Sequence, residues 1–170
     1  MLEKKVEKIL NEQVEKEGYS SHLYLAMASW AENSGFKGIA GWLYAQAEEE
    51  RIHMLKLVRY VNERDGKAVI PVIKLPPAKY AGIKEMFDQV LEHEQYITAS
   101  INDIVGVCIE QKDFTTHNWI QWFVNEQIEE EASARDIIDK LRLVGTQNMY
   151  LFDRDITGMR RPSANTGGEA

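Results

Sequence analysis

Four glutamates interrupt apolar rows near the midpoints of four long amphipathic segments. Each row repeats every seven residues, as one face of a helix does, and a carboxylate stands where an apolar side chain is expected. These residues are Glu17, Glu50, Glu94 and Glu130. His53 follows Glu50 by one helical turn, and Gln127 precedes Glu130 by one turn, so both lie near the same faces. The spacing predicts a polar layer of oxygen donors across the centre of a helical bundle.

These carboxylates need a compensating positive charge. An unpaired buried carboxylate costs on the order of several kcal/mol, and no lysine or arginine falls on the four rows. Two Fe²⁺ ions would neutralise the four glutamates, with His53 and Gln127 as uncharged donors. Oxygen-rich ligation with one imidazole suits iron or manganese better than copper or structural zinc. We therefore expect a dinuclear iron centre.

Each feature also has an ordinary explanation when it is taken alone. An isolated glutamate in a helix is usually solvated, and a Glu-x-x-His pair arises by chance in charged helices. A cofactor-free bundle with an accidental acidic core is therefore the non-enzymatic alternative, and its carboxyl groups would have raised pKa values. His22, His93 and His117 lie off the rows and are predicted to be surface residues.

Further residues with chemical potential lie next to the predicted ligands. Glu49, Glu126 and Glu129 stand one helical step away, so their spacing predicts either an acidic surface patch or a third iron position. Tyr24 lies two turns from Glu17 on the same row. A buried tyrosine is more often a core aromatic than a redox partner, and both roles stay open for Tyr24.

Four long helices must position these residues. The predicted helices cover 4–33, 36–64, 83–111 and 114–144, and a short fifth helix covers 147–157. The four prolines fall outside all of them, and Asn, Asp and Gly residues follow the helix ends, as is typical of helix termination.

The long connection between the second and third helices decides the predicted topology. Three of the four prolines lie between residues 65 and 82, which show no helical period. About 17 extended residues reach ~55 Å, more than the ~42 Å length of each helix, so the second and third helices can be parallel. The predicted fold is all-α, a ferritin-like four-helix bundle with one long crossover. Residues 1–157 form this bundle with its fifth helix, and 158–170 form a flexible C-terminal tail.

Composition excludes several classes of protein. A chain of 170 residues with 44% hydrophobic and 28% charged residues has the size and mix of one globular domain. A net charge of −7, without a basic cluster longer than two residues, argues against a nucleic-acid partner. No stretch approaches the roughly 20 apolar residues of a membrane span, and no secretory signal is evident. The single Cys108 excludes a disulfide framework. We expect a cytoplasmic protein without a membrane partner.

The set of motifs resembles the prokaryotic non-haem ferritins, within the ferritin-like diiron superfamily. The resemblance covers about residues 2–157 and includes the EEERIH run at 48–53 and the NEQIEEE run at 125–131. It implies iron storage in a hollow homo-oligomeric shell of about 24 subunits. It also implies a ferroxidase that oxidises Fe(II) with O₂ or H₂O₂ and deposits ferric mineral inside the shell.

The resemblance assigns roles to individual residues. The first iron position matches Glu17, Glu50 and His53. The second matches Glu50, Glu94 and Glu130, with Gln127 close by. The third position of bacterial ferritins matches Glu49, Glu126, Glu129 and Glu130, and Tyr24 matches the tyrosine beside the family's centre.

Related classes carry different residues at these positions. Bacterioferritins place a haem-binding methionine between the Glu and His of the second helix, where this chain has Arg51 and Ile52, so no haem is expected. Bacterioferritins and rubrerythrins carry a second Glu-x-x-His, where this chain has Gln127 and Glu130. The alternative enzyme class is a discrete diiron oxidase or a rubrerythrin-like peroxidase, although this chain has no rubredoxin-type cysteine set.

Overall fold

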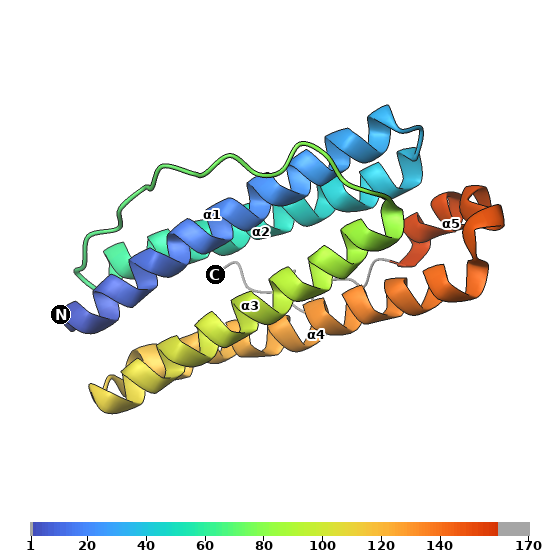
Figure 1. The fold of residues 1–170 in the computed structure, drawn as a ribbon. Helices are drawn as coiled ribbons and strands as arrows, with labels where there is room; N and C mark the ends of the chain where they lie inside the picture. Colours follow the sequence, from blue (N-terminus) through green and yellow to red (C-terminus); the bar gives the residue numbers. More distant parts are fainter. Residues whose placement is uncertain (1, 160–170) are drawn as a thin grey trace.

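The computed structural model describes residues 2–159, which form four long helices with a short helix at one end (Figure 1). The helices are α1 (Lys4–Asn33), α2 (Lys37–Glu63), α3 (Ile83–Glu110), α4 (Phe114–Val144) and α5 (Met149–Asp155), with 3₁₀ turns at Thr146–Asn148 and Ile156–Met159. The bounds of the four long helices agree with the predicted ones to within one residue at each end. The all-α fold and the short fifth helix are confirmed.

Short turns join the helices into two antiparallel pairs. Between α1 and α2, Gly35 adopts a φ of 90°, in the left-handed region that favours glycine after a helix. Between α3 and α4, Lys112 has a φ of 56°, and the Asp113 carboxylate accepts a hydrogen bond from the backbone N of Thr116 as the N-cap of α4. Each turn therefore reverses the chain at one end of the bundle.

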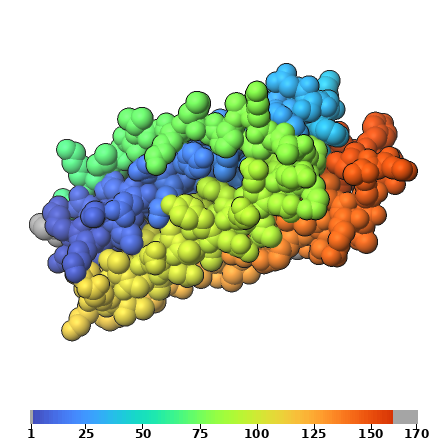
Figure 2. Space-filling model, viewed as in Figure 1, coloured from blue at the N-terminus to red at the C-terminus, as the bar shows by residue number. Residues whose placement is uncertain are grey.

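The crossover between α2 and α3 runs along the bundle beside α1 (Figure 1). It returns the chain to the end at which α2 began, so α2 and α3 are parallel, as predicted. Figure 2 shows this segment lying on the outer side of α1. It is anchored at its start by Asn11 of α1, which accepts a hydrogen bond from the backbone N of Val69 at 2.7 Å.

The apolar core is divided into two clusters, and buried polar residues lie between them. One cluster, near the α1–α2 turn, includes Leu43 and Phe87. The other, near the start of α1, includes Leu10 and Ile101. The buried polar side chains include Gln13, Glu17, Gln46, Glu50, His53, Glu94, Ser100, Gln127 and Glu130. Apolar packing on both sides shields this polar layer from water, which strengthens electrostatic interactions within it.

The short helix α5 packs against the start of α2. Phe152 and Ile156 are buried in the apolar cluster near the α1–α2 turn. The backbone N of Ile39 donates a hydrogen bond of 2.9 Å to Oδ1 of Asp153, so α5 supplies a partner for an otherwise unpaired amide at the helix start. The backbones of α2 and α5 approach so closely that a Cβ on Gly38 would lie 1.7 Å from the carbonyl oxygen of Asp153. Glycine at position 38 is therefore required for this contact.

The predicted C-terminal tail is only partly within the described residues. Gly158 and Met159 belong to the last 3₁₀ turn, and residues 160–170 lie outside the described part of the chain. The division into bundle and tail stays a prediction. Among residues 2–159, no helix has both the length and the hydropathy needed to cross a membrane.

Candidate metal centre

Each long helix contributes one of the four predicted glutamates to the polar layer. Glu17 comes from α1, Glu50 from α2, Glu94 from α3 and Glu130 from α4, and all four are at most 9% exposed. Each helix buries the apolar residues one or two turns away on the same face, and this packing carries the carboxylate inward with them. The predicted convergence of the four rows is therefore present in the structure.

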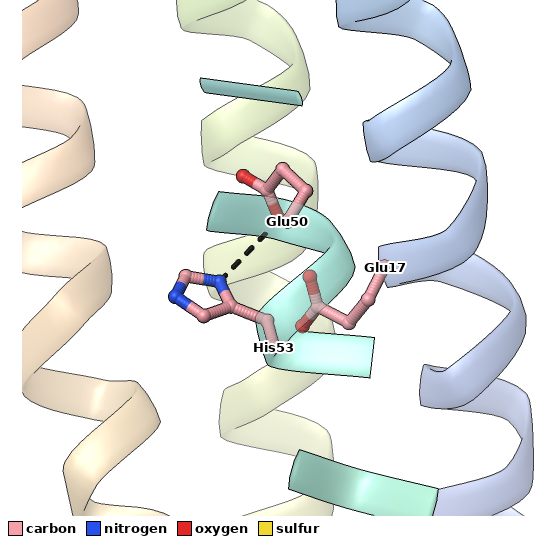
Figure 3. Close-up of side chains that lie close together, drawn as sticks. All are labelled: Glu17, Glu50 and His53. Carbon is pink, nitrogen blue, oxygen red and sulfur yellow. Dashed lines mark ion pairs between the residues drawn. The ribbon is translucent and has the colours of Figure 1, made fainter. Parts of the chain in front are cut away.

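Three of the predicted ligands form a compact group. The ligand atoms of Glu17, Glu50 and His53 all lie within 4.8 Å of one another. Figure 3 shows Glu17 extending from α1 toward Glu50 and His53 of α2, with Nδ1 of His53 lying 3.4 Å from Oε2 of Glu50. Within the described residues, Oε2 of Glu17 is buried without a hydrogen-bond partner. Two carboxylates and an imidazole, with an unsatisfied buried oxygen on one of the carboxylates, form a donor set that fits a divalent iron or manganese ion.

The other two carboxylates are held by hydrogen bonds from neutral side chains. Glu94 accepts a hydrogen bond from the hydroxyl of Tyr24 and another, of 3.2 Å, from Nε2 of Gln127. Glu130 accepts a hydrogen bond of 2.7 Å from Nε2 of Gln46. Neither carboxylate belongs to a group of three ligand atoms within 4.8 Å among the described residues. Their part in a second iron position stays a prediction.

The four carboxylates nevertheless interact strongly. Burial, and to a smaller extent the charge of Glu50, raise the pKa of Glu17 to about 8. Burial also raises the pKa of Glu94 to about 7, against hydrogen bonds from Tyr24 and Gln127 that lower it. The pKa values of Glu50 and Glu130 lie well above 4.5 because of burial and the charge of Glu94. A cation bound among these groups would favour their ionised forms and lower all four pKa values.

A second group lies beside the first and shares its histidine. Ligand atoms of Glu49, His53 and Glu126 lie within 4.8 Å of one another, and Glu126 is buried. Glu129 is half-buried and is not part of this group. The charge of Glu129 does raise the pKa of Glu126, although burial is the larger cause. The structure thus brings together two of the residues predicted for a third iron position and adds His53 to them.

Aromatic rings surround the ligands on two sides. His53 packs edge-on against Trp122 and Phe123, with ring centroids 5.2 and 5.8 Å apart. On the other side Tyr24, which is fully buried, packs edge-on against His93 at 6.3 Å. The prediction that His93 is a surface residue is wrong. Its ring is half-buried and lies 2.7 Å from the hydroxyl of Ser20, and burial lowers its pKa to about 4.

Three polar residues of the layer were missed from the sequence. Gln13 and Gln46 donate hydrogen bonds to Glu17 and Glu130, and Ser100 donates one to Gln13. One signal could have found the two amides. Each stands four residues before a predicted ligand on its own helix, which places it on the same buried face.

The sequence of this chain matches the family model for the ferritin-like domain over residues 7–144. The chain belongs to the ferritin family. The resemblance stated from the motifs is thereby confirmed, and the fold of this ferritin is the one that the family match predicts.

Individual relatives of this ferritin cover nearly all of its length. It is 42% identical over 158 residues to the bacterial non-heme ferritin of Campylobacter jejuni, covering 92% of this chain and 95% of the relative. It is 36% identical over 159 residues to the bacterial non-heme ferritin of Escherichia coli, covering 92% and 96%. Among solved structures, an open pore ferritin from the archaeon Archaeoglobus fulgidus superposes with a TM-score of 0.90 at 38% identity, covering 94% of this chain and 98% of the other.

Proposed function

We propose that this ferritin oxidises Fe(II) at a dinuclear centre within each subunit and stores the ferric product inside a shell of about 24 subunits. The cytoplasm is the proposed location. The observation that carries this proposal is the buried group of Glu17, Glu50 and His53, with an unsatisfied oxygen on Glu17. Relatives named bacterial non-heme ferritins support the storage role.

The first Fe(II) binds Glu17, Glu50 and His53, and the second binds Glu50, Glu94 and Glu130. Glu50 bridges the two ions. Each Fe(II) gives one electron to O₂, which leaves as hydrogen peroxide after taking up two protons. The negative charge of the carboxylates favours Fe(III) over Fe(II), so the site lowers the barrier to oxidation. Carboxyl groups that are protonated before iron binds release their protons as iron binds, because iron stabilises the ionised form.

The second position is built for release of its product. Its side chains also have neutral hydrogen-bond partners: Tyr24 and Gln127 bond to Glu94, and Gln46 bonds to Glu130. These donors can form their hydrogen bonds to the carboxylates again when the ferric ion leaves. Gln127 is an uncharged and therefore weak ligand, whereas bacterioferritins and rubrerythrins carry the glutamate of a second Glu-x-x-His at this position. Storage requires this turnover, because each centre must oxidise many ions in succession.

The acidic group of Glu49, His53 and Glu126 provides a third iron position beside the dinuclear centre. Because His53 belongs to both groups, the third position lies next to the first. We propose that it holds iron on its way to or from the dinuclear centre.

The crossover supplies a contact between subunits. Val72 and Leu75 are 91% and 92% exposed, and Ile70 is 68% exposed. Apolar side chains this exposed on one segment are typical of an interface. The alternative is that the crossover only covers the bundle. A charged substitution at Val72 that leaves the shell intact would favour that alternative.

Sedimentation after iron loading tests the proposed function. Fe(II) is added in air to the purified apo protein at many ions per chain, and protein and ferric absorbance are followed together during sedimentation. Ferric iron that travels with a particle of the mass of about 24 chains is the expected result. A small particle that holds only about two ions per chain would instead indicate a discrete diiron oxidase.

A further inference from the structure

A chain of buried hydrogen bonds leads from α3 to Glu17. The hydroxyl of Ser100 lies 2.8 Å from Oε1 of Gln13, and Nε2 of Gln13 lies 2.9 Å from Oε1 of Glu17. Gln13 and Glu17 are one turn apart on α1, whereas Ser100 comes from α3. Gln13 and Glu17 are each 1% exposed, and Ser100 is 3% exposed. Bulk water therefore does not compete for these bonds.

The ionised form of Glu17 fixes the direction of both bonds. A carboxylate can only accept hydrogen bonds, so the amide of Gln13 must present its NH₂ group to Glu17. The amide oxygen of Gln13 then faces Ser100 and accepts a hydrogen bond from its hydroxyl. The Ser100 hydroxyl also lies 2.9 Å from the backbone carbonyl oxygen of Ile97, and its single proton is shared between these two acceptors. When Ser100 donates to Gln13, it holds the amide in the one orientation that an ionised Glu17 can use.

The two oxygens of Glu17 consequently differ. Oε1 is occupied by Gln13, whereas Oε2 is buried without a hydrogen-bond partner among the described residues. Glu17 is also one of the three residues whose ligand atoms lie within 4.8 Å of one another, with Glu50 and His53.

We propose that Gln13, held by Ser100, is a positioning residue that occupies Oε1 of Glu17 and presents this carboxylate to the first iron position through Oε2 alone. The inference rests on the proposed function, because it concerns the ligand geometry of the same centre. A carboxylate bound through one oxygen fills one coordination position of the metal ion. A second position is thereby left for oxygen or water, as catalytic metal sites require.

Gln13→Leu removes the amide and keeps a side chain of similar size. The full-length apo protein is titrated with Co(II) alone without oxygen, and visible absorbance reports each metal ion bound. The affinity of the first position is expected to fall about 10- to 100-fold, as is typical when a hydrogen bond to a metal ligand is removed. The affinity of the second position should change much less, since Glu94 and Glu130 have other donors.

Substitutions of Ser100 provide a second test of the same series of hydrogen bonds. Ser100→Ala should weaken the first position less than Gln13→Leu does, because the amide remains but loses its orientation. Ser100→Thr, which keeps the hydroxyl, should restore the affinity. The double variant Gln13→Leu/Ser100→Ala should be no weaker than Gln13→Leu alone, since both residues act through one bond to Glu17.

A matched control separates positioning from general stability. Thr116 is fully buried and accepts a hydrogen bond of 3.0 Å from the hydroxyl of Tyr60, outside the polar layer. Thr116→Val should lower the free energy of unfolding without changing Co(II) binding. Unchanged first-position affinity in a folded Gln13→Leu or Ser100→Ala protein would overturn the positioning role, and additive losses in the double variant would do the same. A wild-type protein that binds no Co(II) would overturn the proposed function itself.

Discussion

The side-chain amide of Gln46 donates a hydrogen bond of 2.7 Å to Oε2 of Glu130, and this bond joins α2 to α4 inside the polar layer. Both side chains are buried. A buried hydrogen bond to a carboxylate is stronger than one between neutral groups, so it restricts where the Glu130 carboxylate can point. Gln46 therefore has the same relation to the proposed second iron position that Gln13 has to the first.

Gln46→Leu should weaken the second iron position. We expect about a 10- to 100-fold loss of affinity in the second step of an oxygen-free Co(II) titration, with a smaller change in the first step. Glu130→Ala, which removes the ligand itself, should produce the same pattern with a larger loss. Equal losses at both steps in Glu130→Ala would contradict the assignment of Glu130 to the second position rather than the first.

Glu50→Ala should abolish fast oxidation, because the bridging carboxylate belongs to both proposed positions. We expect the initial rate of Fe(II) oxidation to fall at least about 100-fold, measured by stopped-flow absorbance at two ions per chain. Glu48→Ala is the matched control, since Glu48 is exposed and pairs with Arg51 on the surface of the same helix. An unchanged initial rate in Glu50→Ala would refute the bridging role.

The third iron position should depend more on Glu126 than on Glu129. Glu126 is 4% exposed and lies with Glu49 and His53, whereas Glu129 is half-buried and outside that group. Glu126→Ala should lower the affinity for a third metal ion by at least about tenfold. Glu129→Ala should retain this ion. The measurement is the binding stoichiometry from calorimetry with a redox-inert divalent ion, and the reverse order of effects would refute the grouping.

The stability of the apo protein should fall as the pH rises from about 4.5 to about 8. The folded state raises the pKa of Glu17 to about 8 and that of Glu94 to about 7, from an ordinary value of 4.5. In this interval the folded chain binds more protons than the unfolded chain, so the free energy of unfolding decreases with increasing pH. Below about 4.5 both states are protonated, and the stabilisation is fully present.

Chemical denaturation of the apo protein across this pH interval provides the measurement. Glu17→Gln should give a flatter dependence and a higher stability at pH 8, because its side chain needs no proton to be neutral. Saturating metal should also flatten the dependence, since it stabilises the ionised carboxylates. Apo stability that rises from pH 5 to pH 8 would contradict the protonated polar layer.

Gly38→Ala should displace α5 from the start of α2. The added Cβ would lie 1.7 Å from the carbonyl oxygen of Asp153, so the backbone must move apart. We expect a loss of about 1–3 kcal/mol in the free energy of unfolding and faster proteolysis at α5. Gly41→Ala is the matched control, because nothing lies within 4 Å of its added Cβ. This control should stabilise α2 by up to about 1 kcal/mol, and a similar loss in both variants would refute the contact.

Much of the fold was predictable because its signals are local. Helix ends follow from residues next to them in the chain. Gly35 tolerates the positive φ of a turn, whereas the prolines of the crossover fix φ and remove hydrogen-bond donors. The buried glutamates were equally predictable, because a polar residue in an apolar row that repeats every seven residues can be recognised from its spacing alone.

The partners of each side chain were decided by the tertiary structure. Gln13 meets Ser100 across 87 residues of sequence, and Tyr24 meets Glu94 across 70. Whether His93 is half-buried, and whether Glu126 joins His53 or Glu129, depends on how far each helix is rotated about its axis. Spacing along one helix does not report that rotation.

The helices, the crossover and the set of carboxylates that share a buried layer were all predictable from local patterns in the sequence. The tertiary structure decides which carboxylate oxygens accept hydrogen bonds. Oε1 of Glu17 accepts one from Gln13, whereas Oε2 of Glu17 has no partner among the described residues. These partners depend on tertiary structure because the donor–acceptor distance of a hydrogen bond varies by only a few tenths of an ångström, and its angle lies in a narrow range. Those distances are set by the packing of all four helices together.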